Sequence, residues 1–341
     1  MNDIRDISSS ELQQFLLENG EKPFRTKQIR EWLWKKGTRN FDEMSNLSVA
    51  LRDKLKSHFT FKTTSIKEEI ESTDHTIKFL FQLHDGELIE GVLIPSQNRV
   101  TACLSSQAGC PLGCIFCATG SMGFKRNLHY AEIFDQFNLM NEKSVINFGR
   151  EISNIVYMGM GEPLLNYEHV MTSIDILTSP DGKALSPSRI TLSTVGIVKG
   201  IRQLADDRFK AGLAVSLHSA DETVRRKLIP AAKNNSLEDL RKALEYFFEK
   251  SNERITFEYL LLQGINDSIK DAEKLAVYCR AFPVKINLIE YNNTGTGLQG
   301  SSKENIEIFS EFLKAKNMVV NIRRSKGQDI SAACGQLVRK Y

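Results

Sequence analysis

The sequence predicts an α/β protein whose main domain is an incomplete barrel of parallel strands. From residue 99 onward, short apolar segments typical of strands alternate with amphipathic segments at helical spacing. Six consecutive β-α units favour a parallel sheet, because parallel neighbours need helical crossovers. Glycine-rich or polar clusters follow most of these strands, as in barrels whose active sites lie at the carboxyl ends of strands. We therefore expect a partial (β/α)6 barrel.

Residues 1–58 predict a small helical accessory domain. Apolar residues recur at helical spacing over 11–18, 25–36 and 47–57. Lysine and arginine side chains surround Trp32 and Trp34 in this part of the chain. The pattern fits a solvated basic face of a helical bundle and an RNA-binding module equally well.

Residues 59–95 change to patterns typical of strands, with a turn signal near residue 85. We expect a β-hairpin bridge between the accessory domain and a main domain over 96–341. Strands are expected at 66–70, 76–83, 87–94, 99–105, 154–160, 189–194, 211–217, 255–262, 284–290 and near 317–323. Helices are expected at 130–142, 167–178, 197–206, 236–250, 269–281 and 303–316.

Composition indicates an ordinary globular enzyme. The 341 residues carry a net charge of +3, which is too small to identify a nucleic-acid binder by itself. The longest apolar runs fall short of the ~18 residues that a membrane span needs, and the first residues do not resemble a secretory signal. Six cysteines, three of them in one tight motif, favour a reducing compartment, so we expect a cytoplasmic protein.

The most informative motif is Cys110-Pro-Leu-Gly-Cys114-Ile-Phe-Cys117, which follows the first strand of the main domain. Three thiolates at this spacing can hold a 4Fe–4S cluster, whose full protein set would be four cysteines. One iron would then be open to the amino and carboxylate groups of S-adenosylmethionine (SAM), a source of radical chemistry. The alternatives are simply buried thiols or a zinc site, although zinc motifs usually include a second His or Cys pair.

Further clusters follow the other strands. Gly161 would let a ligand approach the backbone closely, and Glu162 could accept hydrogen bonds from an ammonium group or from ribose. The carboxylate, ribose and adenine of the same ligand could be bound by Ser193, Ser216, His218 and Asn292. A lone histidine such as His218 is more often structural.

Three cysteines lie outside the motif. Cys279 falls on an amphipathic helix and is expected in the core, whereas Cys103 lies seven residues before the motif. Cys334 follows small residues and precedes a glycine in a segment that looks exposed. Most isolated cysteines are inert, so these positions alone do not establish a reactive role.

Three stretches together resemble the RlmN/Cfr family of radical SAM RNA methyltransferases, most closely its RlmN branch. They are Ser105-Ser-Gln-Ala-Gly-Cys-Pro-Leu-Gly-Cys-Ile-Phe-Cys-Ala-Thr-Gly120, Gly159-Met-Gly-Glu-Pro-Leu-Leu-Asn166 and Asp329-Ile-Ser-Ala-Ala-Cys-Gly-Gln-Leu337. The resemblance extends over nearly the whole chain and implies a partial barrel of the radical SAM type. It also implies methylation of carbon 2 of an adenine in the peptidyl-transferase centre of 23S rRNA, and of the adenine next to the anticodon in some tRNAs. The alternatives are a Cfr-like enzyme acting on carbon 8, a radical SAM enzyme with a non-RNA substrate, and a non-catalytic iron–sulfur RNA-binding protein.

The resemblance also implies a mechanism that uses two SAM molecules per turnover. Cys334 is methylated by the first, and the second, bound to the cluster, yields a 5′-deoxyadenosyl radical that takes a hydrogen atom from the S-methyl group. The carbon radical adds to the base, Glu90 accepts the proton of carbon 2, and Cys103 releases the product through a transient disulfide with Cys334. For this disulfide to form, the α-carbons of Cys103 and Cys334 must come within roughly 7 Å of each other.

The implied SAM contacts are Gly161, Glu162, Ser193, Ser216, Leu217, His218 and Asn292, and the implied cluster ligands are Cys110, Cys114 and Cys117. Further expectations are a monomer with no membrane association and an electron donor such as flavodoxin or ferredoxin. Phosphate contacts are expected from the basic groups Lys125-Arg126, Arg225-Arg226-Lys227, Arg323-Arg324 and Lys326, although each also fits a solvated face.

Overall fold

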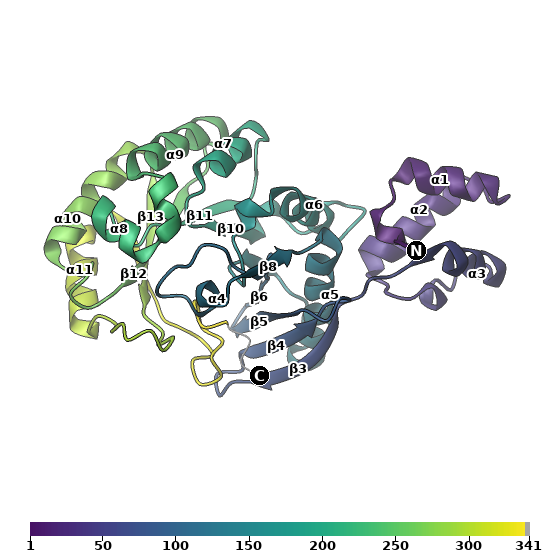
Figure 1. Cartoon of the computed structure of the whole chain (residues 1–341), viewed down its shortest axis with the longest axis horizontal. Coiled ribbons are helices and arrows are strands. Elements are labelled where there is room, and N and C mark those ends of the chain that lie inside the picture. Colours follow the sequence, from purple (N-terminus) through teal and green to yellow (C-terminus); the bar gives the residue numbers. More distant parts are fainter. Residues whose placement is uncertain (338–341) are drawn as a thin grey trace.

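The computed structural model describes residues 1–337, and within them the centre of the protein is a curled ten-stranded sheet with helices on its outer side (Figure 1). The strand order is β14-β13-β12-β11-β10-β9-β6-β5-β4-β3. The parallel strands are β6 (Arg99–Cys103), β9 (Asn154–Tyr157), β10 (Ile190–Thr194), β11 (Gly212–Ser216), β12 (Ile255–Leu261), β13 (Val284–Glu290) and β14 (Val319–Arg323). Since β14 and β3 form the two edges, the barrel is open, as predicted.

The crossover helices follow the predicted order. They are α5 (Tyr130–Phe148), α6 (Tyr167–Thr178), α7 (Val198–Asp206), α9 (Leu237–Ser251), α10 (Ile269–Tyr278) and α11 (Lys303–Ala315). A short further helix, α8 (Glu222–Leu228), precedes α9 and was not predicted. None of the helices in the described residues has the length and apolar content that spanning a lipid bilayer requires.

Helix α5 is six residues longer than the predicted segment 130–142. It begins at a capping box in which His129 caps the helix and Glu132 returns a hydrogen bond to the backbone of His129. It ends at Gly149, whose φ of 65° is the left-handed conformation that closes many helices. The apolar stripe weakens after Met140, so periodicity alone placed the end too early.

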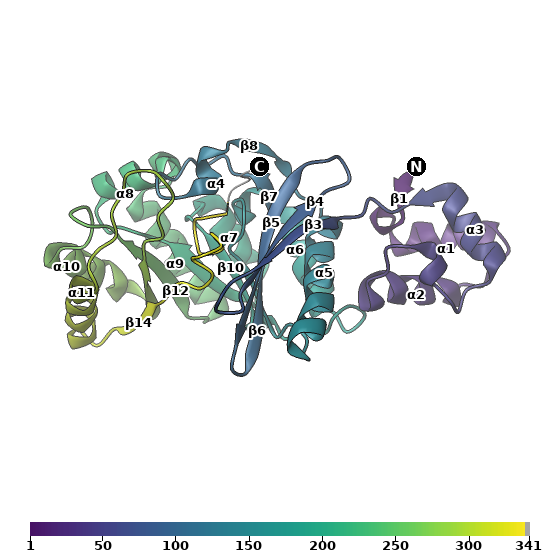
Figure 2. The same ribbon diagram turned by 90° about the horizontal axis from the view of Figure 1, so that it is seen from below.

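The segment predicted as a bridging hairpin forms three antiparallel strands that extend the main sheet. These are β3 (Ser65–Glu71), β4 (Ile77–Gln82) and β5 (Leu88–Ser96), and β5 pairs with β6 so that Val92 lies opposite Cys103. Because side chains alternate along a strand, Glu90 lies on the same sheet face as Val92 and Cys103. The extension is visible as crossed strands in Figure 2.

The amino-terminal helices α1 (Ser9–Glu18), α2 (Phe24–Arg30) and α3 (Val49–His58) form a module beside α5 (Figures 1 and 2). The predicted helix 25–36 changes to π-helical geometry over Glu31–Lys36. Trp34 is buried and packs edge-on against Phe134 of α5, with ring centroids 5.3 Å apart. This ring therefore anchors the module to the main sheet's helix layer and is not an exposed surface for stacking bases.

A buried ion pair also connects the amino-terminal module to helix α5. Arg5 Nη1 lies 2.8 Å from Asp135 Oδ1 of α5, and Arg5 Nη2 lies 2.8 Å from Asp3 Oδ2. Replacing Arg5 by alanine leaves two buried carboxylates without their cation, and we expect the free energy of unfolding to fall by about 3–5 kcal/mol. Chemical denaturation measures this loss. The matched control is Arg39→Ala, which removes an exposed pair with Glu142 and should cost under about 1 kcal/mol. Equal losses for the two variants would contradict the assigned role of Arg5.

Candidate active site

Two short strands hold the ends of the loop that carries the three motif cysteines. Strand β7 (Gln107–Gly109) pairs with β8 (Phe124–Asn127), and the backbone N–H of Cys110 donates to the carbonyl of Gly123 at 2.9 Å. A Cβ on Gly109 would lie 2.0 Å from that same carbonyl oxygen, so only glycine fits at this closure. The remainder of the loop passes through the one-turn helix α4 (Ala118–Ser121).

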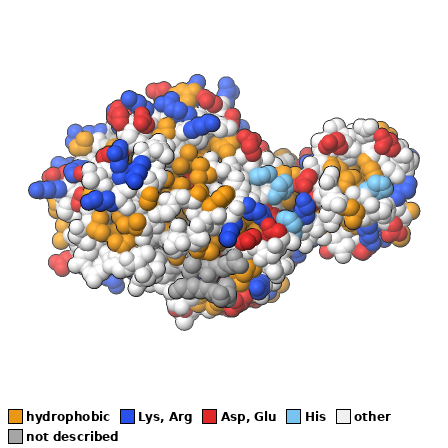
Figure 3. Space-filling view, viewed as in Figure 1, with side chains coloured by type: hydrophobic (Ala, Val, Ile, Leu, Met, Phe, Trp, Pro, Cys, Tyr) orange, Lys and Arg blue, Asp and Glu red, His pale blue; other side chains and the backbone are white. Residues whose placement is uncertain are grey.

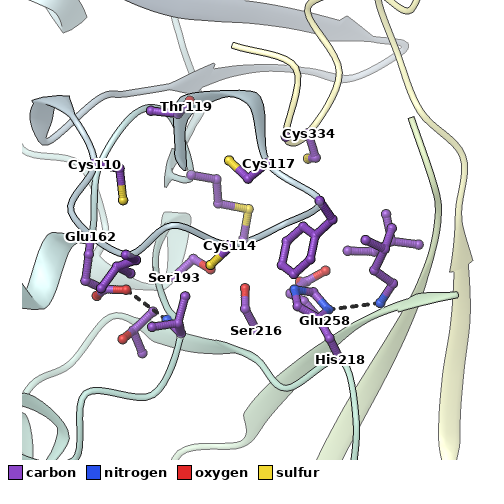
Figure 4. A pocket seen from close by; sticks show the side chains of 18 of the residues that line it. Cys110, Cys114, Cys117, Thr119, Glu162, Ser193, Ser216, His218, Glu258 and Cys334 are labelled. Carbon is purple, nitrogen blue, oxygen red and sulfur yellow. Dashed lines mark hydrogen bonds between the residues drawn. The ribbon is translucent and has the colours of Figure 1, made fainter. Parts of the chain in front are cut away.

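The thiols of Cys110, Cys114 and Cys117 line one cavity, named here the cysteine cavity, at the carboxyl ends of the parallel strands (Figure 4). In the part of the chain that the structure describes, no three His, Cys, Asp or Glu side chains converge closely enough to hold a single metal ion. In a 4Fe–4S cluster each thiolate binds a different iron, which requires a wider arrangement. Burial raises the pKa of the Cys110 thiol to about 12, and a bound metal would reverse this effect by stabilising the thiolate. Three thiols that line one cavity are the donor set that such a cluster takes, so the residues present fit it.

Glu162 also lines the cysteine cavity, in the turn after β9, and lies below Cys110 in the view of Figure 4. Its Oε1 accepts from the N–H of Leu164 at 3.0 Å and its Oε2 from the N–H of Val195 at 2.8 Å. Gly161, with φ of 99°, packs so closely on Gln107 that a Cβ would lie 2.5 Å from its side chain. Burial raises the pKa of Glu162 to about 7. An ammonium group of a ligand would stabilise the ionised carboxylate.

Most other predicted ligand contacts line the same cavity, but they differ in the groups that they can present to a ligand. Ser193 and Ser216 present side chains at the ends of β10 and β11 (Figure 4). His218 Nδ1 accepts from the N–H of Leu260 at 3.0 Å, and burial lowers the pKa of His218 to about 3, so its ring is neutral. Leu217 instead packs into the hydrophobic core with no exposed surface, which leaves only its backbone for a ligand.

The segment that carries Cys334 closes one side of the cysteine cavity. The carbonyl of Gly335 accepts from the N–H of Ala118 at 2.7 Å, directly after Cys117. Asn292 Nδ2 donates to the carbonyl of Cys334 at 3.1 Å, so this predicted SAM contact holds the carboxyl-terminal segment here. Cys334 is exposed and lies beside Cys117 in Figure 4.

Cys334 also lines a second cavity, named here the thiol cavity, together with Cys103 at the end of β6. The two thiols that are far apart in the sequence are thus brought to one space. Burial, with a smaller effect of Cys334, raises the pKa of Cys103 to about 12, while Arg323 opposes the shift. Glu90 is almost fully buried on β5, with Oε1 3.4 Å from Lys78 Nζ.

The sequence-based prediction missed Glu258 and expected Arg323 only as a phosphate contact. Glu258 of β12 and Arg323 of β14 line both cavities, and Arg323 Nη1 lies 3.3 Å from Glu258 Oε2. Asn287 Nδ2 donates to Glu258 Oε1 at 2.8 Å. A carboxylate within the otherwise apolar run 255–262 was the available signal for Glu258.

Several predicted phosphate contacts are engaged inside the protein. Arg323 pairs with Glu258, Arg126 pairs with Glu132 at 2.7 Å, and Arg225 is buried with 1% of its surface exposed. The members of these basic groups that are exposed are Lys125, Arg226, Lys227, Arg324 and Lys326.

An open parallel barrel with three clustered cysteines at its carboxyl end defines the radical SAM class of enzymes. The family described as "Radical SAM superfamily" matches residues 104–276, and the "Ribosomal RNA large subunit methyltransferase N-terminal domain" family matches residues 2–61. The class uses a 4Fe–4S cluster and SAM as cofactors.

Comparison with individual proteins narrows the class. Relatives named "Probable dual-specificity RNA methyltransferase RlmN" from Cytophaga hutchinsonii and Christiangramia forsetii are each 46% identical over 99% of this chain, covering 93% and 96% of their own lengths. The crystal structure of a radical SAM methyltransferase from Sphaerobacter thermophilus superposes with a TM-score of 0.93 at 37% identity, over 99% of both chains. The chain belongs to the RlmN family of radical SAM methyltransferases, which confirms the resemblance stated from its motifs.

Proposed function

We propose that this protein methylates carbon 2 of adenine in the peptidyl-transferase centre of 23S rRNA and next to the anticodon of some tRNAs. Its relatives are named dual-specificity RNA methyltransferases. The observation that carries the proposal is the position of Cys334, which borders both the cysteine cavity and the thiol cavity that contains Cys103. A side chain in this position can receive a group in one cavity and deliver it in the other.

The proposed chemistry begins at Cys334, whose thiolate takes a methyl group from one SAM. Cys110, Cys114 and Cys117 would hold the cluster, which would supply the electron for cleavage of a second SAM, and the S-methyl group on Cys334 would give up the hydrogen atom. The resulting carbon radical adds to carbon 2 of adenine. The radical adduct then loses the proton of carbon 2, for which Glu90 is the proposed acceptor, and its unpaired electron would return to the oxidised cluster held by the three cysteines.

Cys103 completes the reaction. Its thiolate attacks the sulfur of Cys334, so that an S–S bond forms as the S–CH2 bond breaks. The electron pair passes to the CH2 group, which takes up a proton and becomes the methyl group of the product. Two electrons from an external thiol then reduce the disulfide for the next turnover. Arg323, which lies by both thiols, stabilises the attacking thiolate.

The SAM molecule that is cleaved is proposed to bind through Gly161, Glu162, Ser193, Ser216, His218, Asn292 and the backbone of Leu217. We further propose a cytoplasmic monomer that takes electrons from a donor such as flavodoxin or ferredoxin. The target base must leave its stack to reach the thiol cavity. Figure 3 shows Lys and Arg side chains gathered near α8 and α9, and the exposed residues Arg226, Lys227 and Lys233 are proposed to contact phosphates there.

The position of the new methyl group tests the proposal. After expression in cells that lack their own activity, digested rRNA is separated and analysed by mass spectrometry, which distinguishes 2-methyladenosine from 8-methyladenosine by retention. We expect 2-methyladenosine, which the Cys103→Ala and Cys334→Ala variants should not release. Formation of 8-methyladenosine would establish the Cfr-like alternative. Full activity after deletion of residues 1–58 would favour a non-RNA substrate.

A turn between β3 and β4 fixes the segment that precedes Cys334. Asp329 accepts from Ser72 Oγ at 2.5 Å and from the N–H of Thr73 at 3.0 Å, and Asp74 accepts from the N–H of Gly327 at 3.1 Å. The hydrogen bonds from Ser72 and Thr73 keep the pKa of Asp329 below its usual value.

Replacing Asp329 by alanine should release this segment, and we expect turnover to fall roughly 10- to 100-fold, because small misplacements of a reacting group are costly. Alkylation of Cys334 by iodoacetamide should become faster in the same variant. Asp53→Ala, which removes an exposed carboxylate of α3, is the control. Unchanged turnover and unchanged alkylation would show that the turn does not position Cys334.

A further inference from the structure

Helix α8 packs directly behind the loop of the three cysteines. The N–H of Ile115 donates to the carbonyl of Leu228 at 3.1 Å, which ties the loop to the end of α8. Leu228 and the next residue, Ile229, share one apolar cluster with Cys110 and Cys114. The side of the loop that faces away from the cysteine cavity is therefore shielded from water by this helix.

Arg225 of α8 places a buried positive charge in that shielded region. Only 1% of its surface is exposed. Its Nη2 donates to the carbonyl of Val195 at 2.6 Å and its Nη1 to the carbonyl of Asn235 at 3.2 Å, and both acceptors are neutral. Within the described residues its Nε has no hydrogen-bond partner.

The acidic residue on the same helix, Glu222, makes its short contacts with other groups and acts on Arg225 only at longer range. Glu222 pairs with Arg226 at 2.7 Å and accepts from the N–H of Leu237 at 2.8 Å. A buried guanidinium bonded only to backbone carbonyls is costly, unless a negative charge lies close by in the working protein. Val195, whose carbonyl binds Arg225, itself lines the cysteine cavity.

A 4Fe–4S cluster held by three thiolates would supply this missing negative charge. The oxidised core carries two positive charges against three thiolate charges, so the assembly is anionic, and one-electron reduction makes it more so. In a region of low dielectric, a fixed cation attracts the reduced form more strongly than the oxidised form.

We propose that Arg225 is the buried counter-charge of the cluster and raises its reduction potential. The proposal rests on Cys110, Cys114 and Cys117 as the cluster ligands. Its consequence is that a modest biological donor can deliver the electron that SAM cleavage needs.

The test measures the reduction potential of the anaerobically reconstituted protein, in the absence of SAM and RNA, by titration monitored with electron paramagnetic resonance. Arg225→Met should lower the potential. At the wild-type midpoint, the ratio of reduced to oxidised cluster should fall at least about tenfold, which corresponds to about 59 mV for one electron. Arg225→Lys, which keeps the charge, should remain closer to wild type. Lys270→Met removes an exposed positive charge of α10 and is the control, for which the potential should stay at the wild-type value.

Incomplete incorporation of the cluster does not obscure the measured potential, because the paramagnetic signal comes only from protein that contains a cluster. An Arg225→Met protein with the wild-type potential would overturn the proposal. If that variant does not fold, Asn235→Asp replaces it, since it places a carboxylate on the residue whose carbonyl binds Arg225; an unchanged potential there would overturn the proposal equally. A wild-type protein that binds no cluster, or retains one after replacement of the three cysteines, would instead show that the ligand assignment itself is wrong.

Discussion

The Cys334→Ala variant is expected to lose RNA methylation completely, with a decrease of at least about 10³-fold in turnover. The expected loss is this large because removal of a covalent nucleophile usually eliminates the pathway that it serves. Cys334 borders both cavities, and its carbonyl is held by Asn292 at 3.1 Å. The measurement is methylated adenosine formed per enzyme, quantified by mass spectrometry of digested RNA. Iron content should remain unchanged, because Cys334 is not a proposed cluster ligand.

Cys279→Ala is the matched control for this experiment. Cys279 is a buried thiol that packs in the hydrophobic core, so its replacement tests for any general effect of removing a cysteine on folding. We expect that variant to retain its activity. Product formation by the Cys334→Ala protein at more than a trace level would exclude a methyl group carried on this sulfur.

The second large effect is expected for Cys103→Ala, which should accumulate a covalent protein–RNA adduct and release no product. In the proposed sequence the base is attached to Cys334 when Cys103 attacks, and the two thiols line one cavity. Without Cys103, the S–CH2 bond has no partner to break it. Denaturing gel electrophoresis with labelled RNA detects the adduct, and nuclease digestion followed by peptide mass analysis locates it.

Two controls make the result for Cys103 specific. The double variant that lacks both Cys103 and Cys334 should form no adduct, because the attachment site is gone. The Cys279→Ala protein should also form none, because it still turns over. If Cys103→Ala releases methylated RNA at the wild-type rate, the resolving role belongs to another group.

The barrel was predictable because its sheet is mostly parallel and its helices are amphipathic. The parallel strands β6 and β9 to β14 are short segments of mostly apolar residues, and apolar residues recur every three to four positions along the crossover helices. The errors fall where local pattern and tertiary structure diverge. The expected hairpin bridge is part of the main sheet because β5 forms hydrogen bonds with β6. The sequence of neither segment alone predicts this pairing.

The site residues that belong to a sequence motif were predictable. Those that come together only through tertiary packing were not. The three close cysteines and the turn at Gly161 were recognisable from spacing and residue type. Glu258 was missed, and Arg323 was expected only as a phosphate contact, because the two side chains meet only when β14 and β12 lie in one sheet. Arg225 was misread for the same reason, since its charge looks like part of an exposed basic group in the sequence and is buried behind the cysteine loop in the structure.

The central claim is that the transferred carbon passes through the sulfur of Cys334. The most direct measurement loads the reduced protein with SAM that carries a deuterated methyl group, without RNA, and then adds RNA with unlabelled SAM. We predict that the peptide containing Cys334 gains one labelled methyl group and that deuterium appears in the adenine of the first turnover. The account would be contradicted if the Cys334 peptide carried no methyl group and the adenine of the first turnover contained no deuterium.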